Sequence, residues 1–319
     1  MTRKQLLFKS LGFGLNAASF VSPDLAGRLT FRLFATPPKP NVRPKERAFL
    51  DTANRQDVVW ECWQIPVFCW GKPGAPLVFC AYGWGYNSGR WRHYVPALVE
   101  AGYRVVAFDP PGHGLAPRGG TLDFPKLVRL ERHLLRQFGG CELILAHSFG
   151  GGCLVEALAG LPRELHPKRV CLMGIFSEVK WIFIVFAEAL GLRPVIFREL
   201  EKHIKKIEGR DLDDYDVART ATELEHIKAL IIHDPQDQVT AFRNAQRNHS
   251  YWKGSALYAP EGAGHNLGTA GVTRRVLQWL IAGQLPEEAT VNDGGLERLP
   301  AVVSAEDLAA SGGVSDYYQ

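Results

Sequence analysis

Residues 143–153 read LILAHSFGGGC, an apolar run that ends in His147 and Ser148 and continues into three glycines. A serine beside glycine is compatible with an ordinary turn or helix start. The stretch is also typical of a nucleophile elbow, in which a serine occupies a sharp strand-to-helix turn flanked by small residues in a G-x-S-x-G pattern. Ala146 and Gly150 hold the flanking positions, so alanine replaces the first glycine. The motif alone leaves both interpretations open, and partner residues must decide.

The length and the charge distribution predict one large domain with extensions. A chain of 319 residues is long enough for one α/β domain and two appended segments. Residues 1–47 contain nine Lys and Arg against two acids, whereas residues 285–319 contain seven acids and one Arg. We expect a basic, amphipathic helical extension at residues 1–56, the α/β domain at residues 57–284, and an acidic, disordered tail at residues 285–319.

The cysteines and the N-terminal sequence indicate the cellular compartment of the protein. The cysteines form no C-x-x-C pair and most lie in apolar runs, as expected for reduced core residues in the cytoplasm. Lys9 and Asn16 interrupt the N-terminal apolar stretch, so export is the less favoured alternative. An amphipathic helix that packs on the domain fits better, and peripheral contact with a membrane is a second possibility. Nothing in the sequence resembles a nucleic-acid-binding module.

From residue 57 onward, apolar strands alternate with helical patterns. The order favours a mostly parallel, eight-stranded sheet with helices on both faces. About 50 residues separate the strand RVCLMGIF, at residues 169–176, from the strand KALIIHD, at residues 228–234. Because this interval is too long for an ordinary crossover, we expect a small helical lid at about residues 177–225.

Two residues late in the chain are candidates to activate Ser148. A serine hydroxyl needs a base, and the base needs a carboxylate that holds one tautomer. His265 follows the last predicted strand on a glycine-rich loop, whereas His249 lies in an amphipathic helical pattern. For the acid we favour Asp237 over Asp234, because Asp237 is far enough past its strand to turn back toward the imidazole. Asp234 is better suited to forming the turn.

Attack of an activated serine on a carbonyl group also places negative charge on the carbonyl oxygen, which backbone N–H groups commonly stabilise. Phe149, directly after the serine at a helix start, is the first expected donor. The second is Trp84 in the loop Tyr82-Gly83-Trp84-Gly85, which follows the strand PLVFCA. We therefore predict oxyanion donors at Trp84 and Phe149.

At residues 57–283 the chain resembles the α/β-hydrolases of the single-domain serine esterase and lipase type. The loop beginning at Tyr82 is similar to the H-G-x-x oxyanion loop, and residues 109–114 (DPPGHG) to the D-x-P-G-x-G turn. The elbow AHSFGG and the pair Asp237 and His265 complete the resemblance. Tyr82 stands where the family usually has His. The family also contains dehalogenases, which share this overall pattern but use Asp as the nucleophile. Ser148 argues against membership in the dehalogenase group.

The resemblance implies an α/β-hydrolase fold and a serine hydrolase that cleaves carboxylic esters through an acyl-enzyme. We expect Tyr82, Trp181 and Phe186 to contact a small-molecule ester with an apolar acyl group, and we expect no cofactor and no metal. Transfer of the acyl group to another acceptor, or cleavage of an amide or peptide, could use the same three residues. A binding protein that merely keeps the fold is the non-enzymatic alternative.

Overall fold

The computed structural model describes residues 3–302, and its centre is a sheet of nine strands. These are β1 (Asn54–Trp60), β2 (Trp63–Trp70), β3 (Leu77–Ala81), β4 (Arg104–Phe108), β5 (Leu143–His147), β6 (Arg169–Met173), β7 (Lys228–Ile232), β8 (Ala256–Tyr258) and β9 (Thr290–Val291). Their order in the sheet is β1-β2-β4-β3-β5-β6-β7-β8-β9. The neighbouring strands β4-β3-β5-β6-β7-β8 are parallel to one another. The pairs β1–β2, β2–β4 and β8–β9 are antiparallel. The predicted eight strands are present, and β9 is an addition from the C-terminal segment.

Helices cover both faces of this sheet. On one face α5 (Phe124–Gln137), α6 (Ser148–Ala159) and α9 (Val217–Ala221) share an apolar core with alternate strand residues such as Phe79 and Ile144. On the other face α3 (Pro44–Leu50), α4 (Val95–Glu100) and α11 (Ala270–Ala282) pack against the intervening residues such as Val78 and Leu145. Successive residues of a strand point to opposite faces, which is why continuous apolar strands need helices on both.

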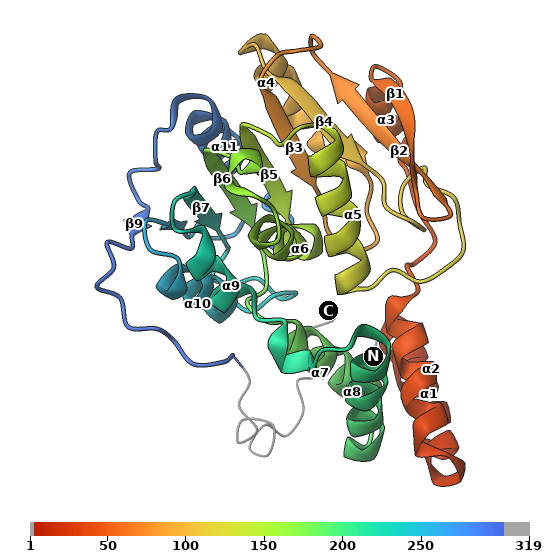
Figure 1. Cartoon of the computed structure of the whole chain (residues 1–319). Coiled ribbons are helices and arrows are strands. Elements are labelled where there is room, and N and C mark those ends of the chain that lie inside the picture. The colour runs from red at the N-terminus through yellow and green to blue at the C-terminus, as the bar shows by residue number, and fades with distance from the viewer. Residues whose placement is uncertain (1–2, 303–319) are drawn as a thin grey trace.

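The N-terminal segment packs against the expected lid. The interval between β6 and β7 forms α7 (Val179–Leu190) and α8 (Pro194–Glu208), followed by short turns and α9. Helix α1 (Arg3–Val21) contacts α7, and α2 (Pro23–Ala35) contacts α8. A Cβ on Gly27 would lie 2.8 Å from the Cβ of Glu199, so glycine permits the close approach of α2 and α8. Figure 1 shows these four helices together at one end of the molecule. Within residues 3–302, no helix is both long and apolar enough to span a bilayer.

The C-terminal segment differs from the expected disordered tail. Residues 285–302 follow the domain surface, and β9 extends the sheet beside β8. The buried Asn292 side chain donates to the carbonyls of His249 and Trp252, and the Val302 amide donates to Glu178 at 2.6 Å. Acidic composition did not prevent docking, because backbone groups and one asparagine supply the hydrogen bonds. The rest of the expected tail, residues 303–319, lies outside the described residues.

Candidate active site

Ser148 occupies a sharp turn between β5 and α6. Its φ of 51° is in the left-handed region, which a non-glycine residue seldom adopts. The glycines after it are needed for packing. A Cβ on Gly150 would collide with the backbone carbonyl of Tyr82, and one on Gly151 would lie 2.6 Å from Ile175. The strand-to-helix turn predicted from residues 143–153 is therefore present, and small residues allow it to form.

Three of the predicted site residues meet at the end of the parallel strands. The Oγ of Ser148 is 3.0 Å from the Nε2 of His265, and the Nδ1 of His265 is 2.7 Å from the Oδ2 of Asp237. Because the carboxylate only accepts, Nδ1 carries the proton and Nε2 is free to accept one from the serine. This arrangement can move a proton away from the Ser148 hydroxyl.

The Asp237 carboxylate is held by several donors. Its Oδ1 accepts from the backbone amides of Val239 and Thr240, and its Oδ2 lies 3.2 Å from the Nε2 of the fully buried His233. Burial alone would raise the pKa of Asp237, but the hydrogen bonds from His233 and His265 outweigh burial and hold that pKa well below its usual range. Asp237 therefore stays ionised beside His265.

Three residues that the sequence did not single out for this purpose fix the loop around His265. Asp234 accepts from the Gly264 amide, and it also closes its own turn by accepting from Gln236 at 2.8 Å. The Nε2 of His147 lies 2.8 Å from the backbone carbonyl of His265. Arg90 donates to the next carbonyl, that of Asn266, at 2.7 Å. Hydrogen bonds thus hold the loop in place on both sides of His265.

The two predicted oxyanion donors lie on segments beside the nucleophile. Phe149 is in the first turn of α6, where backbone N–H groups have no partner within the helix. A Cβ on Gly83 would lie 2.8 Å from the Cβ of Ser148, so the loop that carries Trp84 passes directly beside the serine. The rings of Trp84 and Phe149 also touch, with centroids 5.3 Å apart.

Tyr82 was expected to contact substrate, but its side chain lies in the apolar core instead. Ala81 belongs to the core of one sheet face and Tyr82 to the core of the other, because successive residues of the extended chain point in opposite directions. The Tyr82 hydroxyl donates to the buried Asp109 at 2.8 Å. The same carboxylate accepts from the amides of Ser88 and Leu115. Tyr82 therefore joins the loop after β3 to the DPPGHG turn.

An aromatic cluster borders Trp84, and one of its members comes from the N-terminal extension. Phe34 of α2 stacks on Trp84, with centroids 6.1 Å apart, and lies 4.0 Å from the ring of Phe183. Phe34 was missed because it lies far in sequence from every motif. Its only local signal is the spacing of Phe31 and Phe34 on one face of a helical pattern.

The two lid residues expected to contact substrate have different surroundings. Phe186 faces the N-terminal helices, since its ring contacts Phe8 and Phe34 at 6.2 Å and 5.3 Å. Because Phe34 also stacks on Trp84, a role of Phe186 in substrate binding stays a prediction. Trp181 is buried in the same core cluster as Phe149 and Phe183, and a role in substrate binding stays a prediction.

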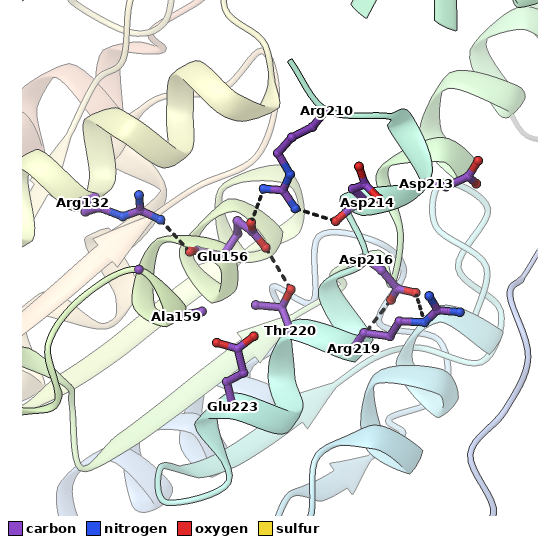
Figure 2. A pocket seen from close by; sticks show the side chains of 11 residues that line it. Arg132, Glu156, Ala159, Arg210, Asp213, Asp214, Asp216, Arg219, Thr220 and Glu223 are labelled. Carbon is purple, nitrogen blue, oxygen red and sulfur yellow. Dashed lines mark hydrogen bonds and ion pairs between the residues drawn. The ribbon is translucent and has the colours of Figure 1, made fainter. Parts of the chain in front are cut away.

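A separate cavity of about 520 Å³ lies near the far end of α6, where charged side chains pair with one another (Figure 2). Glu156 accepts from Arg210 at 3.0 Å and from Thr220 at 2.9 Å, which ties the segment after α8 to α6. Glu156 is eight residues beyond Ser148, roughly 12 Å along the helix. Within residues 3–302, no group of three or more His, Cys, Asp or Glu side chains could hold a metal ion.

Comparisons with known proteins identify the family of the chain. The model of the Alpha/beta hydrolase family matches residues 77–270. The chain is 40% identical over 109 residues to epoxide hydrolase A of Mycobacterium tuberculosis, covering 34% of this chain and 33% of that protein. It is 39% identical over 89 residues to a non-heme chloroperoxidase of Kitasatospora aureofaciens, covering 27% of this chain and 32% of the relative. The matched segment thus spans about a third of the length of these curated relatives.

Solved structures extend the likeness over more of the chain. The esterase of Exiguobacterium antarcticum superimposes with a TM-score of 0.54 and covers 70% of this chain and 97% of the esterase. At 18% identity this likeness shows the fold alone. The α/β-hydrolase architecture therefore covers most of the chain.

Proposed function

The chain belongs to the alpha/beta hydrolase family, and we propose that it hydrolyses carboxylic esters through an acyl-enzyme on Ser148. The observation that carries this proposal is the continuous hydrogen-bond path from the Oγ of Ser148 through His265 to Asp237, with distances of 3.0 Å and 2.7 Å. A serine so placed can lose its proton as it attacks a carbonyl carbon.

In the first half of the reaction Ser148 Oγ bonds to the ester carbonyl carbon while its proton passes to the Nε2 of His265. Asp237 stabilises the resulting imidazolium. The tetrahedral intermediate collapses when the bond to the alkoxy group breaks, and the departing alcohol takes the proton from His265. The amides of Trp84 and Phe149 are the proposed donors to the oxygen that becomes negative.

In the second half a water molecule attacks the acyl group and gives its proton to His265. The acyl–serine bond then breaks, the carboxylic acid leaves, and the proton returns to the Oγ of Ser148. No electron is gained or lost in either half, so the cycle needs only ester and water.

The proposed acyl site is apolar. Trp84, Phe149, Phe34 and Phe183 form a connected aromatic cluster beside the nucleophile, and such a surface favours an alkyl or aryl acyl group over a charged one. We therefore propose a small-molecule ester with an apolar acyl chain as substrate.

Active-site labelling and a single substitution test the proposal. A fluorophosphonate probe should label Ser148, and p-nitrophenyl esters should be hydrolysed with release of free carboxylic acid. Ser148→Ala should lower kcat on the order of 10⁶-fold, as in other serine hydrolases, whereas Ser10→Ala at an exposed position of α1 should leave kcat unchanged. Labelling at another residue, or undiminished turnover by Ser148→Ala, would refute the mechanism.

A further inference from the structure

The outward face of α1 is a continuous uncharged stripe. Residues three and four apart share one side of a helix, and the exposed residues with this spacing are Leu6, Leu7, Ser10, Phe13, Gly14, Ala17, Phe20 and Val21. Phe13 and Phe20 are each 77% exposed, and Val21 is 90% exposed. We call these eight residues the α1 stripe. Leu25 and Leu29 of α2 are also exposed.

The opposite face of α1 is fixed against the helical lid. A Cβ on Gly12 would collide with the backbone carbonyl of Leu190, and Leu15 is buried with Leu190 in a small apolar cluster. The side chain of Asn16 donates to the carbonyl of Gly191 at 2.8 Å and accepts from the amide of Arg193 at 3.0 Å. These contacts determine which side of α1 faces the lid, so most of the α1 stripe faces solvent. One contact reaches it, from the Arg193 guanidinium, which lies 4.1 Å from the centre of the Phe20 ring.

The α1 stripe is unusual for an exposed surface. Exposed apolar residues elsewhere in residues 3–302, such as Val59 and Val239, lie on separate elements, and scattered residues of this kind are normal. A contiguous apolar face with two phenylalanines marks an interaction site.

The charge around the α1 stripe indicates the kind of partner. By sequence, α1 carries Arg3, Lys4 and Lys9 and no acidic residue. The first 47 residues have nine basic and two acidic side chains. A second copy of the same surface would bring these positive charges together, whereas an anionic surface would attract them.

We propose that the α1 stripe lies on the surface of a lipid bilayer that contains anionic phospholipids. Helix α1 does not have the apolar length to cross a bilayer, but an amphipathic helix can lie in the interface with its apolar face among the acyl chains and its basic residues at the headgroups. The proposal does not depend on ester hydrolysis.

Vesicle flotation tests this with the full chain. The protein should float with phosphatidylcholine vesicles that contain phosphatidylglycerol, and less with phosphatidylcholine alone or at high salt, because part of the attraction is electrostatic. The double variant Phe13→Ser and Phe20→Ser should lower the partition coefficient at least about tenfold. Thermal melting of both proteins checks that the fold is retained.

Matched variants and light scattering complete the test. Val59→Ser and Val239→Ser remove exposed apolar side chains elsewhere and should float like the unmodified protein. Ser148→Ala should also float, which separates this proposal from the catalytic one. Failure of the unmodified protein to float, or a dimer in solution that the Phe13 and Phe20 substitutions dissociate, would overturn membrane binding.

Discussion

The Nε2 of His147 donates a hydrogen bond to the backbone carbonyl of His265 at 2.8 Å. His147 precedes Ser148 in the sequence, yet its side chain contacts the base and not the serine. Burial, with the nearby charge of Arg90, holds the pKa of His147 well below its usual range. The imidazole is therefore neutral, and a neutral ring that faces a carbonyl must carry its proton on that nitrogen. His147 is thus a positioning residue for His265.

We expect His147→Phe to lower kcat by about 10- to 100-fold with little change in KM, because a small displacement of the base slows proton transfer more than substrate binding. His147→Gln retains a side-chain donor and should recover part of the rate. Steady-state kinetics on one p-nitrophenyl ester, with melting temperatures alongside, measures both. Equal losses of rate and stability in the two variants would indicate packing alone.

Phe34 should influence the choice of acyl chain. Its ring contacts Trp84 and Phe183, so Phe34→Ala should change kcat/KM by about 1–3 kcal/mol in a way that depends on acyl length. Phe138→Ala is the matched control, because Phe138 is a half-buried phenylalanine that directly follows α5 and packs under Arg104. It should lower stability and affect all esters alike. The measurement is kcat/KM from acetyl to dodecanoyl esters, and identical profiles for both variants would contradict the assignment.

Acid should destabilise the fold through buried histidines. Burial lowers the pKa of His113 from 6.5 to about 4, so between these values the unfolded chain binds a proton that the folded chain does not. Stability therefore falls as pH drops from about 6.5 to 4, by about 1.4 kcal/mol per pH unit for this group. His113→Gln should reduce the loss between pH 7 and 5 by about 2 kcal/mol, as read from urea unfolding at both pH values. The exposed His133→Gln is the control and should behave like the unmodified chain.

Asn292 tests whether residues 285–302 contribute to stability. Its buried amide donates to the carbonyls of His249 and Trp252. Asn292→Ala should remove these two hydrogen bonds and cost about 1–3 kcal/mol, with Ser255 still donating to both carbonyls. Asn54→Ala, at an exposed position of β1, should cost much less. The measurement is the urea unfolding midpoint of both variants. An unchanged midpoint for Asn292→Ala would mean that residues 285–302 contribute little to the free energy of unfolding.

The sequence was sufficient for the features that depend on local pattern. Apolar runs of strand length, separated by helical periods, predicted β1 to β8 and the fold class, which the structure and the family match confirm. The strand-to-helix turn at Ser148 was visible in the sequence because neighbouring backbone and side chains leave room only for glycine at the positions after it. Chain order then indicated His265 and Asp237, because parallel strands bring their carboxyl ends to one edge of the sheet.

Contacts between distant segments were decided only by the tertiary structure. Nothing near Phe34 in the sequence shows that α2 reaches Trp84, and nothing near Asn292 shows that it caps two carbonyls of the domain. Tyr82 was assigned to the wrong surroundings because the direction of its side chain depends on strand register. Local pattern determines which residues can form an element and which face is apolar. Which faces then meet depends on the packing of the whole chain. The hydrophobic effect is non-directional, so it favours burial of an apolar face without selecting the partner.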